Sequence, residues 1–398
     1  MKRKLNALPF LIIASLFFLV NAYVLSGIHS LSAQPWITPL FWAFIVSMAL
    51  ALLYSIQRIR LQGMDLFFKI MTHAFLILIT AELLFSIVLI PNDLYRLFKG
   101  VPRNLYWLEL AWLVFFLIIA VFIYGMVRGK YAYRVIKHTL YFNDLPSNFD
   151  GFRITQISDV HAGSFNNPKA VQKGIELIRQ QKSDLFVFTG DLVNNQAEEI
   201  KPWIEAFNKI KAPYGQFSVL GNHDYGDYIK WESEAAKQAN LEQLKNYHKE
   251  LGFKLLLDEH VKIDKNGQHI ILAGVENWGI GFGERGDLAR AMQHTHTNDF
   301  KILLSHDPSH WKAEVLKFPS KIHLTLSGHT HGMQFGIEAF GIKWSPVKYR
   351  YAHWAGITET EGQYLNINRG FGFLGFSGRV GIWPEITVIE LKRTPEIS

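Results

Sequence analysis

The segment ITQISDVH, residues 154–161, organises the chain that follows its first 150 residues. Its first half alternates β-branched and polar residues, which predicts a strand. Its second half contains Asp159 and His161, and residues two apart in extended backbone project to the same face. A carboxylate and an imidazole are therefore expected to lie together just beyond the end of a strand.

The same arrangement recurs four times further along the chain. The repeats are FVFT (186–189) before Gly190-Asp191, FSVL (217–220) before Gly221-Asn222-His223-Asp224, ILLS (302–305) before His306-Asp307, and LTLS (324–327) before Gly328-His329-Thr330-His331. Glycine permits a sharp turn and a close approach of backbone to a ligand. Ligands of open α/β sheets bind outside the carboxyl ends of strands. These oxygen and nitrogen donors, in a chain without cysteine, indicate one site for hard or borderline divalent metals.

In order, these five motifs resemble those of the calcineurin-like metallophosphoesterase superfamily, over roughly residues 150–392. The alternation of strands and helices by itself indicates an α/β sandwich. The resemblance implies two mixed sheets packed face to face with helices outside, an αββα sandwich.

The resemblance also implies a centre of two divalent ions, Mn²⁺, Fe²⁺ or Zn²⁺, bridged by Asp191. One ion is expected on Asp159, His161 and His331, and the other on Asn222, His306 and His329. His223 is expected to contact the phosphate and protonate the leaving oxygen, with Asp224 orienting its imidazole. The residues Asp307-Pro308 are interpreted as a turn, and His294 and His296 as part of a solvated loop. His310, His323 and His353 are expected at the surface or behind the ligands.

The charge of the 398-residue chain is unevenly distributed. Residues 1–150 hold 13 Lys and Arg against 6 Asp and Glu, whereas the other 28 basic residues are balanced by 28 acidic ones, so the whole formal excess of +7 is N-terminal. This distribution argues against a nucleic-acid-binding catalytic domain and for positive charge that flanks a membrane.

Four apolar stretches, 8–25, 36–56, 66–90 and 106–127, each approach the ~20 residues that a membrane-spanning helix needs. The alternatives are a cleaved signal peptide for the first stretch and a soluble helical domain for all four. We expect an integral, multi-pass membrane protein with a transmembrane region at 1–130, a linker and edge strand at 131–150, and a catalytic domain at 151–398. The Lys and Arg distribution favours both termini, and hence the catalytic domain, in the cytoplasm.

Two ionisable residues, His73 and Glu82, interrupt the third apolar stretch. They are interpreted either as a functional site or as partners in a hydrogen bond between helices. In the catalytic part, strands are expected at 134–142, 253–257 and 269–275. Helices are expected at 168–181, 197–211, 231–251 and 287–293, the first capped by Asn166 or Asn167 with Pro168 at its first position.

The tail, with Asn368-Arg369-Gly370-Phe371-Gly372, Arg379 and Pro384-Glu385-Ile386, resembles a branch of bacterial, often membrane-attached phosphoesterases. Some members of that branch act on phospholipids or on nucleotide-linked lipid A precursors, and Met333 replaces its usual glycine. Arg369 or Arg379 is interpreted as a phosphate ligand or as part of a structural ion pair. The apolar residues of the tail are interpreted as an acyl-chain groove or as core: Phe371, Phe373, Leu374, Phe376 and Trp383.

The sequence therefore predicts a membrane-anchored hydrolase of a phosphoester substrate, a lipid-linked phosphodiester or pyrophosphate, with the bilayer as its second partner. One alternative is a hydrolase of soluble, nucleotide-type phosphodiesters. The other is a membrane sensor or scaffold that binds a ligand without turnover.

Overall fold

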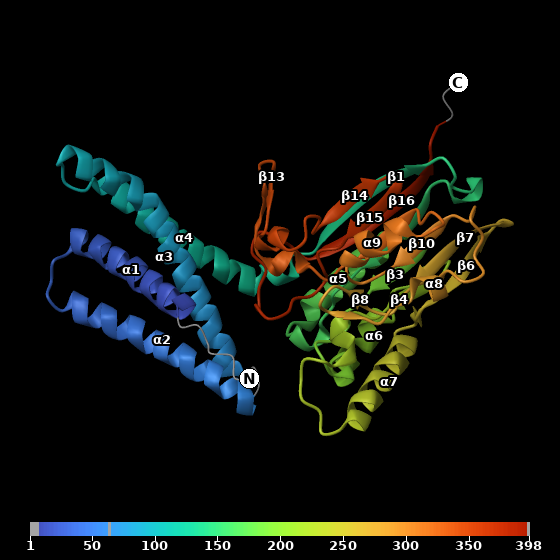
Figure 1. Ribbon diagram of the computed structural model, residues 1–398, viewed down its shortest axis with the longest axis horizontal. Coiled ribbons are helices and arrows are strands. Elements are labelled where there is room, and N and C mark those ends of the chain that lie inside the picture. Colours follow the sequence, from blue (N-terminus) through green and yellow to red (C-terminus); the bar gives the residue numbers. More distant parts are fainter. Residues whose placement is uncertain (1–7, 63–64, 396–398) are drawn as a thin grey trace. The chain divides into compact units, whose positions relative to one another are not determined.

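The computed structural model describes residues 8–62 and 65–395, and the chain divides after Tyr124 into two compact units (Figure 1). The first unit holds the N-terminal helices. The second unit begins at Gly125, within the last turn of the fourth long helix, and contains both large sheets.

The helical unit contains four helices that are long and apolar enough to cross a membrane: α1 (Leu8–Leu31), α2 (Ile37–Gln62), α3 (Leu66–Lys99) and α4 (Leu105–Val127). The helix α3 is longer than the predicted apolar stretch because it continues through Pro91 to a left-handed cap at Gly100. A small cluster around Phe85 and Leu108 is buried, while most large apolar side chains face outward. This inside-out distribution of apolar surface is the one that a bilayer requires.

Polar groups inside the helical unit fall into two kinds. Arg103 pairs with Asp93, and the Tyr23 hydroxyl donates to Asp93 Oδ2 at 2.9 Å, which ties α1 to the end of α3. Glu82, in contrast, is 1% exposed and its Oε2 has no hydrogen-bond partner among the described residues. The ring of His73 bonds the carbonyl of Lys69 on its own helix. Oε2 of Glu82 therefore does not make the hydrogen bond between helices that was one of the two interpretations of this residue.

The catalytic unit is built from two six-stranded mixed sheets. The first sheet has the order β1 (Arg134–Phe142), β16 (Glu385–Arg393), β2 (Phe152–Ile157), β3 (Leu185–Thr189), β4 (Gln216–Val219) and β5 (Lys254–Leu255). The second has the order β14 (Gly356–Thr360), β15 (Gln363–Ile367), β11 (Leu324–Ser327), β10 (Lys301–Leu304), β7 (Gln268–Gly274) and β6 (Glu259–Lys265). The edge strand predicted at 134–142 is confirmed as β1.

The core lies between the two sheets, as their sequence patterns require. It joins Ile154 and Val187 of the first sheet to Leu272, Ile302 and Leu326 of the second. A second cluster packs helices against the outer face of the first sheet, and a third does so for the second sheet. The predicted αββα sandwich is thus confirmed.

The helices of the catalytic unit agree with the sequence in part. The helix α5 (Pro168–Gln180) is capped by Asn167, whose side chain accepts from Ala170 N, and α7 (Glu234–Glu250) is capped by Ser233. The prediction of one helix at 197–211 is wrong, because Pro202 interrupts it. That segment instead forms two 3₁₀ turns and α6 (Ile204–Phe207).

Three further short elements differ from the expectations. The helix predicted at 287–293 shrinks to α8 (Leu288–Ala291), and the strand predicted at 253–257 shrinks to the two residues of β5. The strand β6 was not predicted, since its charged residues mask the alternation of a solvent-facing edge strand. The catalytic unit also contains α9 (Ser309–Ala313), several short 3₁₀ helices and two small hairpins, β8–β9 (Trp278–Gly279, Gly283–Glu284) and β12–β13 (Ile337–Ala339, Ile342–Trp344).

Candidate metal centre

The five motif segments meet at one edge of the sandwich. The strands β2, β3 and β4 run parallel, as do β10 and β11, so their carboxyl ends lie together. The loops beyond them bond to each other, for example from Asp159 N to the carbonyl of Gly190 at 2.9 Å. A Cβ atom on Gly190 would lie 2.6 Å from the backbone nitrogen of Gly221, so only glycine allows this approach.

Five predicted ligands adopt positive φ angles, between 46° and 68°, which non-glycine residues rarely do: Asp159, His161, Asp191, His329 and His331. Such strained backbone persists only where the surrounding structure imposes it, and it gathers at functional sites.

The first group of potential ligands is Asp159, His161 and His331, all of them buried. His331 Nε2 lies 3.2 Å from Asp159 Oδ1 and 3.0 Å from His161 Nε2. The three donor atoms fall within 4.8 Å of one another, which is compatible with one ion between them.

The second group is Asp191, His306 and His329, with Asn222 beside them. His306 Nε2 is 3.1 Å from Asp191 Oδ2, and His329 Nδ1 is 2.9 Å from Asn222 Oδ1. The structure thus brings together all seven residues predicted as metal ligands.

Asp191 lies between the two groups. Its Oδ2 atom is 3.5 Å from His161 Nε2 of the first group and 3.1 Å from His306 Nε2 of the second. Carboxylate oxygens and imidazole nitrogens carry lone pairs, and their convergence in a buried cluster is favourable when cations lie among them. The donor set therefore fits a pair of divalent ions.

Neighbouring groups fix the orientation of three of these ligands, as is usual at metal sites. The carbonyl of Thr189 accepts from His306 Nδ1 at 2.7 Å, which turns Nε2 towards Asp191. Asp307 Oδ2 lies 3.4 Å from His329 Nε2, so the free lone pair of His329 is on Nδ1. The amide nitrogen of Asn222 donates to the Tyr228 hydroxyl at 2.7 Å, which directs its oxygen to the cluster.

Sequence reasoning missed Asp307 and Tyr228 as parts of the site. Asp307 was interpreted as a turn residue, yet its side chain is buried and also accepts from Tyr351 Oη at 3.1 Å. The only available signal was a carboxylate directly after the predicted ligand His306. Tyr228 follows Asn222 by six residues, and nothing in the local sequence marks it.

The pKa values report a negative potential in the cluster. Burial alone would lower the pKa of His306, but the Asp191 carboxylate, helped by Asp159, raises it to about 10. Burial lowers the pKa of His329 to about 4, although the carboxylates of Asp307, Asp191 and Asp159 act in the opposite direction. The negative potential that favours a proton on His306 also favours a metal cation at the same place.

His223 is half-buried at the rim, and its Nδ1 lies 2.9 Å from the carbonyl oxygen of Asn194, so this nitrogen carries the proton. The ring stacks on Tyr228, with 4.4 Å between centroids. The expectation that Asp224 orients this imidazole is wrong. The carboxylate of Asp224 instead accepts from four backbone amides, those of Asp191, Leu192, Val193 and Gly221. Asp224 shapes the loops that carry the ligands, and Asn194 orients His223.

The two arginines of the tail are structural. Arg369 pairs with Glu385 (Nη1 to Oε2, 2.5 Å) and Glu338 (Nη2 to Oε1, 2.6 Å). Arg379 is fully buried and donates from Nε and Nη2 to the carbonyl of Gly372 at 2.9 and 2.6 Å. The ion-pair interpretation is thus confirmed for Arg369.

The core interpretation is confirmed for two of the apolar residues of the tail, and the groove stays a prediction for the others. Phe371 and Phe373 belong to the core, whereas Leu374, Phe376 and Trp383 are partly exposed. Met333 has φ 50°, which explains the glycine that the resembling branch places there.

The other histidines lie outside the cluster. His294 and His296 are exposed, as expected for a solvated loop, and so is His353. His310 and His323 are buried, and they contact Ser305 and Asp144 respectively.

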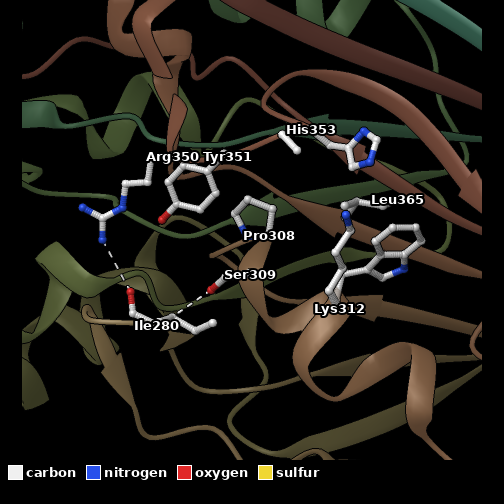
Figure 2. A pocket seen from close by; sticks show the side chains of 10 residues that line it. Ile280, Pro308, Ser309, Lys312, Arg350, Tyr351, His353 and Leu365 are labelled. Atoms are coloured by element: carbon white, nitrogen blue, oxygen red, sulfur yellow. Dashed lines mark hydrogen bonds between the residues drawn. The ribbon is translucent and has the colours of Figure 1, made fainter. Parts of the chain in front are cut away.

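A cavity of about 380 Å³ is lined in part by Pro308 and Tyr351, which neighbour Asp307, the partner of His329 (Figure 2). Tyr351 forms part of its wall and connects it to the site, because the Tyr351 ring lies 5.8 Å from that of His329. Lys312, Arg350 and His353 line the opening, and Trp311 lies deeper. Lys312 and Arg350 therefore give the cavity positive charge.

Comparisons with known proteins agree with this geometry. Residues 152–333 match the family model "Calcineurin-like phosphoesterase", and residues 6–130 match "Probable Calcineurin-like phosphoesterase, transmembrane domain". The chain belongs to the calcineurin-like metallophosphoesterases, in a form with a four-helix membrane domain.

Among its relatives, the uncharacterised metallophosphoesterase YkuE of Bacillus subtilis is 30% identical over 277 residues, which are 68% of this chain and 90% of YkuE. An uncharacterised metallophosphoesterase of Aquifex aeolicus is 27% identical, over 66% of this chain and 93% of that protein. A transmembrane protein with a metallophosphoesterase domain from Danio rerio is 26% identical, over 68% and 60% of the two chains. The protein is a membrane-associated phosphoesterase of a metal-binding family.

Proposed function

We propose that this protein is a phosphoester hydrolase that uses two divalent ions and acts at the membrane on a lipid-linked phosphodiester or pyrophosphate. The observation that carries the proposal is the place of Asp191 Oδ2, between two groups of donor atoms that each suit one ion. Asp159, His161 and His331 would hold one ion, Asn222, His306 and His329 the other, and Asp191 both. Bound there, the ions would act as Lewis acids and supply a hydroxide near neutral pH.

The residues of the chain would perform the remaining chemistry. Cleavage of a phosphoester bond leaves an oxygen that needs a proton, and His223 is the general-acid candidate at the rim of the cluster. Its Nδ1–H donates to the Asn194 carbonyl, so the imidazolium form would carry its second proton on Nε2. Transfer of that proton to the leaving oxygen would return the ring to its neutral Nδ1–H form. Tyr228 keeps the ring in place by stacking and at the same time holds Asn222.

Turnover of a chromogenic phosphodiester by the purified full chain tests this proposal. We expect activity with Mn²⁺ and none after chelation. His223→Gln should lower kcat by about 10²–10⁴-fold, while the exposed-histidine control His294→Gln stays at the wild-type rate. Bound metal without turnover of any phosphoester would favour a sensor or scaffold and overturn the proposal.

The lipid preference draws support from the membrane domain and from the cavity beside the cluster. The catalytic unit begins inside α4, so it is covalently tethered to the membrane domain. Lys312 and Arg350 would contact an anionic group next to the scissile phosphate. Rates on detergent-dispersed lipid phosphodiesters and pyrophosphates should exceed those on soluble nucleotides. Equal rates would remove the lipid preference and leave a general phosphodiesterase.

We further propose that the catalytic unit faces the cytoplasm. The Lys and Arg residues of the loops and flanking segments lie mostly on the side of the membrane that holds the two termini. By the positive-inside rule, that side is the cytoplasmic one. We expect activity after Ser398 from a reporter that works only in the cytoplasm, and none from a reporter that works only after export. Activity of a reporter that requires export would reverse the orientation.

A further inference from the structure

In the small hairpin β12–β13 the two charged side chains bond to the protein, while two isoleucines of the other face are exposed. Glu338 and Lys343 are opposite each other in register, and both contact the domain, through Arg369 and the Ala355 carbonyl respectively. Strand alternation then directs Ile337 and Ile342 outward, and they are 49% and 55% exposed. This is the reverse of the pattern of a hairpin on a soluble protein.

The tip of the hairpin is more unusual than its face. Its two-residue turn is Phe340-Gly341, with φ angles of 54° and 77°, and the Phe340 side chain is 101% exposed. Turns of this shape favour Asn-Gly, and a bulky residue at positive φ is strained. Figure 1 shows that the hairpin stands out from the sheets of the catalytic unit.

A second hairpin of the same unit provides the ordinary case. The strands β6 and β7 are joined by Asn266-Gly267, with φ angles of 52° and 81°. The two turns have the same length and nearly the same backbone, so the turn itself does not require an aromatic residue. Phenylalanine at the tip of β12–β13 thus has a role outside the fold.

We propose that the β12–β13 hairpin inserts its tip into the bilayer to which the chain is anchored, so that Ile337, Phe340 and Ile342 contact lipid. A bilayer suits this surface better than a protein partner does. The catalytic unit starts within a membrane-spanning helix, and the residues after the hairpin are those of a lipid interface: Tyr349 is 79% exposed and lies between the exposed cations Lys348 and Arg350. Aromatic residues and cations of this kind sit at the headgroups of anionic lipids, while apolar residues reach the acyl chains. This inference does not depend on the proposed activity.

Spin labels on the full chain in nanodiscs test the insertion, and the absence of cysteine allows single sites without prior substitutions. The label is placed at Ala339→Cys, which keeps Phe340, and the matched control is Asn266→Cys in the ordinary turn. Relaxation by lipid-soluble oxygen should exceed relaxation by an aqueous nickel chelate at 339, with the opposite order at 266. Adding Phe340→Asn and Ile342→Asn to the label at 339 should reverse its preference, because asparagine suits the turn but not the bilayer.

Two results would overturn the proposal. One is a label at 339 as accessible to the nickel chelate as the control. The other is protection of the label at 339 from both reagents, which would mean that protein, not lipid, covers the hairpin.

Discussion

Two buried polar clusters of the catalytic unit differ in how their charges are satisfied. In the arginine network, formed by Glu338, Arg369, Arg379 and Glu385, each arginine meets carboxylate or carbonyl oxygens. In the ligand cluster, the seven residues proposed as metal ligands, lone-pair atoms face one another. The clusters are neighbours, with Arg379 Nη2 only 3.3 Å from His331 Nδ1.

The difference separates a stabilising element from a binding site. The arginine network joins its cations to carboxylate and carbonyl oxygens of the chain, although Arg379 Nη1 has no partner among the described residues. These contacts fix the conformation of the tail. A buried group of acceptors is completed by a cation. Substitutions in the ligand cluster should therefore lower activity and change folding stability little. Substitutions in the arginine network should lower folding stability. Substitutions in each cluster test this contrast.

The largest effect is expected for Asp191→Asn. The substitution keeps the shape and the acceptor for His223 N, at 2.9 Å, but removes the charge shared by both groups. Loss of several kcal/mol of transition-state stabilisation corresponds to about 10³-fold or more in kcat/KM. Bound metal measured by mass spectrometry should fall with activity, while thermal unfolding in chelator remains near the wild-type value. An active, metal-loaded Asp191→Asn protein would contradict the assignment of the cluster.

The opposite result is expected for Glu385→Ala. Its carboxylate is fully buried and pairs with Arg369, which is 7% exposed, so truncation leaves a buried cation with one partner, Glu338. We expect a loss of about 3 kcal/mol in the free energy of unfolding, the lower end for a broken buried pair. Tryptophan fluorescence during denaturant unfolding of the full chain in detergent measures it. The control Glu338→Gln, on the more exposed side, should lose less; equal losses would mean that burial does not determine the effect.

The contrast between the two clusters also shows which site residues can be predicted from the sequence. Repetition of one motif predicts the ligands, since all seven follow one of five strands within four residues of its end. It does not distinguish Arg369 from a phosphate ligand, because the partner Glu338 is 31 residues away in sequence. Asp307, Asn194 and Tyr228 were missed for the same reason: their roles come from contacts between loops that only the tertiary fold brings together.

An intermediate effect is expected for Asp307→Asn, which tests whether the ligand cluster extends beyond its ligands. Asp307 orients His329, and loss of such a partner typically weakens metal affinity by about 10–100-fold. A metal titration of activity should show this loss for one of the two ions, that of His329. The control Tyr351→Phe removes the 3.1 Å hydrogen bond to Asp307 but keeps the carboxylate, so its affinity should change only slightly. An Asp307→Asn protein with wild-type affinity for both ions would place Asp307 outside the site.

The smallest effect concerns His248, a buried imidazole without the carboxylates that surround His306. It is bonded to Ser218 at 2.9 Å, and its Nε2 has no partner among the described residues. Burial lowers the pKa of His248 to about 3, whereas Asp191 raises that of His306. Between about pH 6.5 and pH 3 the unfolded chain binds a proton at His248 that the folded chain excludes, so stability falls as the pH falls.

From pH 7.5 to pH 5, this single group should cost about 2 kcal/mol of folding stability, at about 1.4 kcal/mol per pH unit below 6.5. His248→Gln removes the titration, so its unfolding temperature should fall less steeply with acid than that of the wild type, even where it is lower at neutral pH. The exposed-residue control His294→Gln should retain the wild-type slope. If His248→Gln kept the full acid sensitivity, carboxylates of the ligand cluster, and not an isolated imidazole, would set the acid limit of the fold.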